Sequence, residues 1–213
     1  SSVEIFRSNP IVQGDLEAFQ QQLIGRKFKH VTRRAKYLIF HLQPSGYMVA
    51  HMRMTGKFIV CDPMDVPSKY NRVWFHLNSR RLMIFDDVRC FGTLEVYEKL
   101  SDSKALSKLG IEPFSEDLNV NYFKSKVASS KREVKSILLD QQIIAGLGNI
   151  YVSEILFRSK ISPLRSTETI HNKEWSQIIK YTQSVLEEAI ENNGTTISDF
   201  RRVDDKTGKF QQF

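Results

Sequence analysis

Hydrophobic and polar positions change their period once along the chain. Before residue 98, short runs rich in β-branched and aromatic residues alternate with turn-forming residues, which is the pattern of β-strands. One helix is predicted at 15–23, where Asp15 is suited to cap the first turn, and hairpin turns are predicted at 43–46 and 78–81. Strands at this spacing predict a β-sandwich or a barrel. The predicted strands are 27–32, 36–42, 46–54, 57–61, 72–77, 81–85 and 93–97.

Beyond Gly110 the apolar residues recur at helical spacing. The polar stretch EKLSDSKALSK lies between the two patterns. We therefore predict an α+β protein with a β-sandwich domain at 1–98, a linker at 99–112 and a helical domain at 113–213. The predicted helices are 115–129, 131–141, 149–158 and 172–193, the last ending at an Asn-Gly pair.

The stretch QQIIAGLGNIYVSEILF, residues 141–157, interrupts a helical pattern with two glycines and resumes it at once. Gly146 and Gly148 permit left-handed dihedrals and a close approach of the backbone, and Asn149 is suited to cap the second helix. Free N–H groups at such a helix start bind phosphate. Lysines at 131 and 135 on the preceding predicted helix would add charge. A plain helix–turn–helix corner with solvated lysines explains the pattern equally well.

Charge and cysteine content narrow the class of partner. The chain has 31 Lys and Arg against 24 Asp and Glu, a formal charge of +7 that favours a polyanion, most often nucleic acid. The two cysteines, Cys61 and Cys90, suggest reduced thiols in a cytosol, and no CxxC or HExxH pattern points to a metal site. No run approaches the ~20 apolar residues of a membrane span. The sequence contains no apolar heptad repeat, so we expect a monomer.

The stretch GLGNIYVSEILF resembles the helix–two-turn–helix signature of the formamidopyrimidine-DNA glycosylase and endonuclease VIII family. The resemblance covers nearly the whole chain and implies a β-sandwich followed by a helical domain with this motif. It also implies a base-excision repair enzyme that flips an oxidised purine, such as 8-oxoguanine or a formamidopyrimidine, out of damaged double-stranded DNA. Further similar segments follow one order along the chain: RRAKYLIF, HMRMTGKF, DDVRCFGTLEVY, LGIEPFSEDL and NGTTISDF.

The resemblance assigns three residues to filling the space that the flipped base leaves. Met54 stands on one predicted loop, and Arg89 and Phe91 stand on another, an arrangement more similar to the formamidopyrimidine branch. An apolar wedge offsets lost stacking, and the arginine pairs with the base opposite the lesion. Core packing is the alternative for Met54 and Phe91, whereas Arg89 on a predicted turn is harder to explain as core.

Further residues match family positions that hold the DNA backbone, and such contacts orient the duplex without reading its sequence. Lys36 matches a lysine near the lesion's phosphate that is implicated in the elimination chemistry; a solvated lysine on an edge strand is the alternative. Residues 69–72, KYNR, occupy the place where relatives often have KHDH, whose first histidine contacts a phosphate. Tyr70 can still donate a hydrogen bond to a phosphate there. Lys131, Lys135 and Asn149 match backbone-contacting positions. The segment after Gly194 corresponds to the loop that covers the flipped base.

The pattern departs from the family at both ends. Relatives begin with proline and glutamate, the amine nucleophile and an acid/base, whereas this chain begins SSVEIFRSNP. Relatives also continue into a four-cysteine zinc ribbon. We therefore expect the core of a longer cytoplasmic, nucleoid-associated enzyme, with zinc in the missing ribbon and no cofactor in this chain, which by itself does not cut DNA. A non-catalytic damaged-DNA-binding protein that keeps the groove and the wedge is the alternative.

Overall fold

The computed structural model describes residues 2–6, 11–66, 69–77, 79–128, 130–192 and 194. They form two compact units, one running to Lys104 and the other beginning at Ala105. This division falls within the stretch 99–112 that the sequence predicts as a linker. That stretch is partly helical, with a 3-10 turn, η1 (Leu100–Asp102), and the short helix α2 (Lys104–Ser107).

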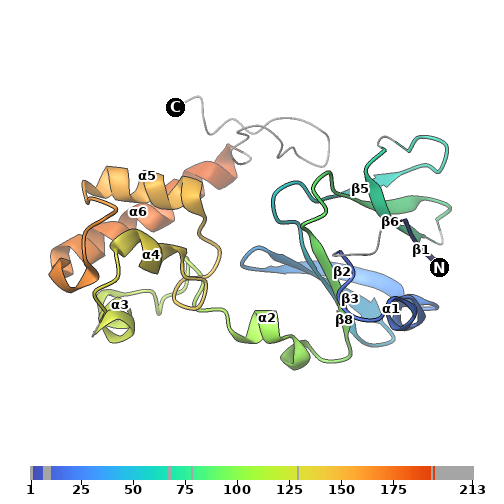
Figure 1. The fold of residues 1–213 in the computed structure, drawn as a ribbon, viewed down its shortest axis with the longest axis horizontal. Coiled ribbons are helices and arrows are strands. Elements are labelled where there is room, and N and C mark those ends of the chain that lie inside the picture. Colours follow the sequence, from blue (N-terminus) through green and yellow to red (C-terminus); the bar gives the residue numbers. More distant parts are fainter. Residues whose placement is uncertain are drawn as a thin grey trace. The chain divides into compact units, whose positions relative to one another are not determined.

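The first unit is built from two four-stranded antiparallel sheets (Figure 1). One sheet has the order β1 (Val3–Ile5), β6 (Asn71–His76), β7 (Leu82–Asp86) and β5 (Lys57–Cys61). The other has the order β2 (Lys27–Arg34), β3 (Tyr37–Gln43), β4 (Tyr47–His51) and β8 (Thr93–Tyr97), and the helix α1 (Leu16–Leu23) contacts β8. The predicted sandwich is confirmed, and β1 is a strand that the sequence pattern did not predict.

Alternating side chains of the two sheets form the core of the sandwich. Phe40 on β3 and Met48 on β4 are register partners and both are buried, as are Phe75 and Met83 on the facing sheet. Burial alternates clearly on β6, whereas β7 is buried at all five positions and β4 at its three central ones, so these two strands read as continuous apolar runs. The predicted hairpins join β3 to β4 and β6 to β7.

The second unit is helical and has its own core. Its helices are α3 (Val120–Val127), α4 (Val134–Leu139), α5 (Asn149–Ser159) and α6 (Asn172–Glu191), with a 3-10 turn, η2 (Thr167–Thr169), between the last two. Trp175 on α6 is almost fully buried and stacks on Phe123 of α3, with 4.7 Å between ring centroids. Arg158 on α5 donates to both carboxylate oxygens of Glu188 on α6, at 2.6 and 2.9 Å. The α+β prediction is therefore confirmed in both halves.

Two predicted helices are shorter than the sequence pattern suggested. The helix expected at 115–129 begins at Val120, because the Asn119 side chain caps it by accepting the Tyr122 N–H at 3.0 Å. The helix expected at 131–141 spans only 134–139. Lys131 therefore precedes α4, because the preceding segment is tied elsewhere: Glu133 is extended and bridges Ser166, and Thr167 donates its N–H to the Arg132 carbonyl at 3.0 Å.

Candidate nucleic-acid interface

Lys36 lies in the two-residue turn between β2 and β3, so it does not sit on an edge strand. Ala35 takes the left-handed conformation that such a tight turn requires, with φ of 51°, and its carbonyl accepts a bond of 2.8 Å from Arg33. The side chain of Lys36 is exposed. Partial desolvation of its amine by nearby protein atoms, and then the charge of Arg53, lower the pKa of Lys36 below its ordinary value.

His51, which no sequence pattern indicated, lies near Lys36 and Arg53, whose charges act on it. His51 ends β4, and its ring packs edge-on against Tyr37, with 4.6 Å between centroids. Its Nδ1 accepts the Arg53 N–H at 2.9 Å. Burial, and then the charges of Arg53 and Lys36, lower the pKa of His51 to about 4. The only signal in the sequence was its place at the start of HMRMTGKF.

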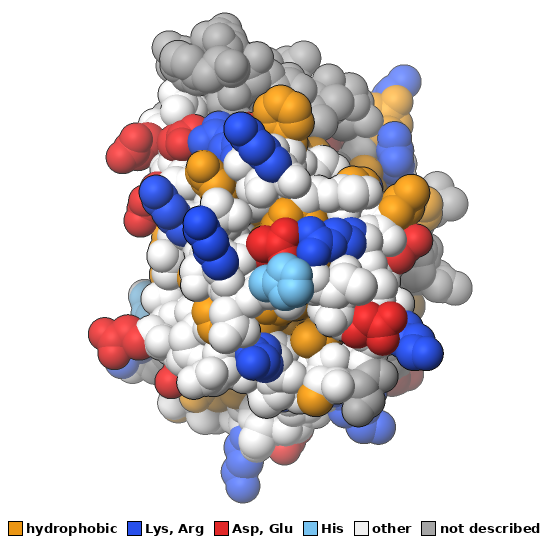
Figure 2. All heavy atoms as spheres, turned by 90° about the vertical axis from the view of Figure 1, so that its left-hand side faces the viewer, with side chains coloured by type: hydrophobic (Ala, Val, Ile, Leu, Met, Phe, Trp, Pro, Cys, Tyr) orange, Lys and Arg blue, Asp and Glu red, His pale blue; other side chains and the backbone are white. Residues whose placement is uncertain are grey.

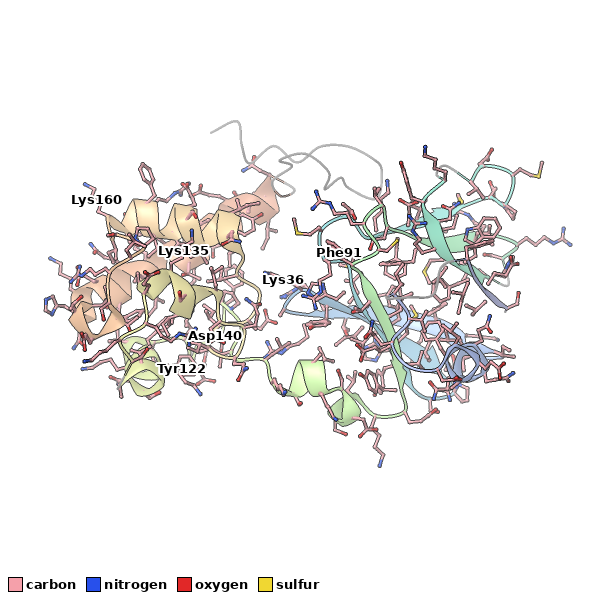
Figure 3. The ribbon with its side chains drawn as sticks, in the orientation of Figure 1. Lys36, Phe91, Tyr122, Lys135, Asp140 and Lys160 are labelled. Atoms are coloured by element: carbon pink, nitrogen blue, oxygen red, sulfur yellow. The ribbon has the colours of Figure 1, made fainter. Side chains whose placement is uncertain are left out.

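Met54, Arg89 and Phe91 lie on two loops of the sandwich unit, β4–β5 and β7–β8. Met54 is 59% exposed and Phe91 is 55% exposed, and Arg89 is also exposed. Core packing is therefore excluded as the explanation for the two apolar residues. In Figure 3, Phe91 and Lys36 lie toward the same end of the sandwich unit, away from the end where α1 lies in Figure 1.

The two loops meet at Asp87, a fully buried residue directly after β7. Its carboxylate accepts hydrogen bonds from the Thr55 hydroxyl of one loop, and from the N–H groups of Arg89 (3.2 Å) and Gly92 (2.8 Å) of the other. Met54 precedes Thr55, and Arg89 and Gly92 bracket Phe91. The contact thus brings together three predicted residues that are up to 37 positions apart in the sequence.

Tyr70 is half-buried, next to β6. Lys69 Nζ lies 5.4 Å from its ring centroid, and the guanidinium carbon of Arg72 lies 5.7 Å from it. The Tyr70 carbonyl accepts the Asp87 N–H at 3.1 Å, so this segment joins the two loops just described. Tyr70 is thus a cation-flanked aromatic, and the charge available to a phosphate there comes from its neighbours.

In the helical unit the glycine junction differs in detail from the expectation. Gly146 has a φ of 100°, as predicted, but Gly148 is extended, with a φ of −129°, and is itself the N-cap of α5. The expectation that Asn149 caps the helix is wrong: it is the first helical residue, and no side chain caps this end. Gln141 holds the turn closed, accepting the Gly146 N–H at 2.9 Å and donating to the Leu147 carbonyl at 2.8 Å. Asn149 is exposed.

Basic residues flank this junction. Lys131 is exposed ahead of α4, and Lys135 is half-buried on it. Arg132, between them in sequence, forms an ion pair of 2.9 Å with Asp140, which offsets its charge. Figure 2 shows Lys and Arg side chains at several places on the face drawn there, with Asp and Glu among them. The two lysines are therefore the better candidates for phosphate contact.

The lesion-covering loop predicted after Gly194 lies outside the described residues. Zinc does not fit the residues present: the chain has two cysteines, and its described part contains no group of three or more His, Cys, Asp or Glu able to hold a metal ion. No helix in the described ranges is both long and apolar enough to cross a membrane.

Comparison with known proteins matches both halves of the chain. Residues 1–94 match the formamidopyrimidine-DNA glycosylase N-terminal domain, and residues 109–201 match the formamidopyrimidine-DNA glycosylase H2TH domain. A formamidopyrimidine-DNA glycosylase of Streptococcus pneumoniae (strain ATCC BAA-255 / R6) is 37% identical over 215 residues, covering 100% of this chain and 78% of that protein. One of Mycoplasma genitalium is 37% identical over 203 residues, covering 93% of this chain and 70% of that protein.

Solved structures agree with this match. A complex between a Lactococcus lactis FPG mutant and a Fapy-dG containing DNA has a TM-score of 0.90 at 30% identity, covering 99% of this chain and 78% of that chain. A complex of the Lactococcus lactis Fpg with an abasic site containing DNA has a TM-score of 0.89 over the same shares, also at 30% identity. With its sandwich and its helix–two-turn–helix unit both matched, the chain belongs to the formamidopyrimidine-DNA glycosylase family of enzymes, which repair damaged DNA bases.

Proposed function

We propose that the protein acts on oxidised purines, 8-oxoguanine and formamidopyrimidines, as a DNA glycosylase with AP-lyase activity. The observation that carries this proposal is the group of Met54, Arg89 and Phe91, exposed on two loops that a single buried residue joins. A wedge needs apolar side chains that are exposed before DNA binds and held on a fixed backbone. Inserting them into a gap in the base stack then buries their apolar surface. Arg89 beside them provides the donors that pair with a base left without a partner.

The chemistry begins with an amine. Its lone pair forms a bond to C1′ of the damaged nucleotide while the glycosidic bond breaks, and the base leaves with the electron pair and a proton. The amine proton is lost, the nitrogen lone pair forms a double bond to C1′, and the C1′–O4′ bond breaks, so that the ring oxygen leaves with its electron pair and takes up a proton. The resulting iminium acidifies the C2′ hydrogen and permits elimination of the 3′ phosphate. In relatives, as inferred from the resemblance, an N-terminal proline supplies this amine; no proline in the printed sequence is followed by glutamate. The wedge residues and the basic residues of this chain are proposed to open and hold the duplex.

Lys36 is proposed to move a proton during elimination. Its pKa is lowered by burial and by Arg53, so a larger fraction of its amine is neutral at a given pH than for an ordinary lysine. Arg53, whose charge acts on Lys36, supplies positive charge for a phosphate, whereas His51, with a pKa of about 4, is neutral at pH 7. Tyr70, Lys131, Lys135 and Asn149 are proposed to hold the DNA backbone.

Binding and trapping measurements test the proposal together. The printed chain is titrated onto duplexes that carry 8-oxoguanine, an abasic site or no lesion, and tighter binding to the first two is expected. Borohydride is then added to the 8-oxoguanine duplex, with the printed chain and with a version preceded by a proline-glutamate start. A covalent adduct is expected from the second alone, because only an amine nucleophile gives a reducible iminium. Equal affinity for all three duplexes would refute the proposal.

A non-catalytic damaged-DNA-binding protein that uses the same exposed wedge residues is the second candidate. Such a protein would also bind lesion-containing duplexes more tightly, but it would form no covalent adduct on borohydride treatment. If the extended version binds the lesion and traps nothing, this second function replaces the first.

A further inference from the structure

We propose that Asp87 is a positioning residue that sets the wedge side chains of both loops in one arrangement, and that Thr55 is the link through which it holds the second loop. The inference rests on the proposed function, since it concerns the residues that would enter the base stack. It assigns a role to two residues that themselves need not touch DNA.

The side chain of Asp87 joins atoms that belong to different loops. Oδ1 accepts from the Thr55 hydroxyl and from the Arg89 N–H, and Oδ2 accepts from the Gly92 N–H. Thr55 also accepts the Arg89 N–H, at 3.1 Å. The residue is fully buried, so these donors stand in for water. Hydrogen bonds to a charged acceptor are stronger than neutral ones, which makes Asp87 an effective anchor.

The backbone of Asp87 fixes a third segment. Its N–H donates to the Tyr70 carbonyl at 3.1 Å, and its own carbonyl accepts from Arg72 Nε at 2.7 Å. One residue therefore connects the segment of Tyr70 with the loops of Met54 and Phe91.

Close packing leaves these loops little freedom. A Cβ on Gly92 would lie 2.5 Å from Phe85 Cζ, and one on Gly56 would lie 2.9 Å from that atom and 2.6 Å from the Met52 carbonyl oxygen. Both loops thus press on one buried ring. Cys90 between Arg89 and Phe91 takes a left-handed conformation, with a φ of 57°, which only surrounding contacts hold in place.

These contacts hold the backbone of both loops rigid, while the side chains of Met54, Arg89 and Phe91 remain exposed. A wedge whose loops are already ordered loses less conformational entropy on entering DNA, so more of its contact energy is available for opening the stack. Breaking the link between Thr55 and Asp87 should therefore weaken lesion binding and leave general DNA binding intact.

Thr55→Val is the decisive variant, because it removes the hydroxyl while keeping a side chain of similar size, and Thr55→Ser is the matched control that keeps the hydroxyl. Amide hydrogen exchange of the printed chain is measured first, without DNA. The Arg89 amide is expected to exchange about tenfold faster or more in Thr55→Val and at the native rate in Thr55→Ser, since the hydroxyl that accepts this N–H and donates to the Asp87 carboxylate is lost. Amides paired between β5 and β7 should not change.

The same proteins are then mixed with duplexes that contain an abasic site next to 2-aminopurine, whose fluorescence rises when it unstacks. Thr55→Val should lower the preference for the damaged over the undamaged duplex by about tenfold and reduce the fluorescence rise, and Thr55→Ser should restore both. Asp87→Asn is a harsher variant that risks misfolding, so the conclusion depends on Thr55.

The outcomes separate the two proposals. If exchange at Arg89 is unchanged in Thr55→Val, or if exchange rises while lesion preference and fluorescence stay native, Asp87 and Thr55 do not position a wedge. If the unaltered chain shows the protected Arg89 amide but neither lesion preference nor a fluorescence rise, the proposed function fails, and the wedge role fails with it.

Discussion

Truncation of Met54 tests the wedge with a control that the chain itself provides. Met54 is 59% exposed and Met64, in the same unit, is 94% exposed. Burying a whole methionine side chain stabilises by roughly 1.5–3 kcal/mol. The exposed 59% of Met54, buried in a base stack, would contribute about 0.9–1.8 kcal/mol. Met54→Ala should therefore weaken binding to an abasic duplex by about fivefold to twentyfold.

Fluorescence anisotropy on abasic and undamaged duplexes measures this effect. Met64→Ala should bind both as the unaltered chain does, because no role in DNA contact is assigned to it. Both variants should keep their thermal stability, since truncating exposed side chains usually changes it by less than about 0.5 kcal/mol. The reasoning is refuted if the two variants bind the damaged duplex equally well, or if Met54→Ala loses affinity for both duplexes in the same proportion.

Three further predictions concern charge. Arg89→Ala should lower discrimination for the base opposite the lesion by about 1–3 kcal/mol while weakening undamaged binding less, and equal losses on every duplex would argue against that role. The logarithm of the affinity should fall with the logarithm of salt concentration at roughly −0.9 per phosphate contact, and Lys131→Ala or Lys135→Ala should each make the slope shallower by about one contact, whereas a flat salt response removes the idea. Burial, then Arg53 and Lys36, hold the pKa of His51 at about 4, below its ordinary 6.5, so its contribution to stability is complete above pH 6.5 and is lost as the pH falls toward 4. The melting temperature of His51→Gln should depend less on pH in that window, and identical profiles would contradict the assignment.

Sequence patterns predicted the elements whose burial follows a regular period. The strand β6 alternates because one of its faces is buried, β7 is an apolar run because it is buried on both faces, and α6 shows a stripe because one side packs on the helical core. Residues 131–133 follow the helical pattern, yet hydrogen bonds and a β-bridge to the segment around Thr167 keep them out of α4. No local pattern contains that information, because the partner lies more than thirty positions away.

The candidate site divides in the same way. Met54 and Phe91 were selected through a resemblance, and their exposure could not be known from residue type, since apolar residues are more often buried. Asp87 was missed because an aspartate near a turn is ordinarily read as a solvated turn residue. Its burial arises only when Thr55, 32 positions earlier, comes into contact with it.

Each unit has a separate core, and the chain has two tryptophans, one in each core-bearing unit. Trp74 stands on β6 against Phe6, with 4.7 Å between ring centroids, and Trp175 is enclosed in the helical unit. Replacing either indole with phenylalanine leaves a protein whose tryptophan emission, excited at wavelengths where tyrosine does not absorb, reports on one half alone. A pair of such melting curves would reveal whether the halves lose structure together or in succession, and a single transition temperature has meaning only in the first case.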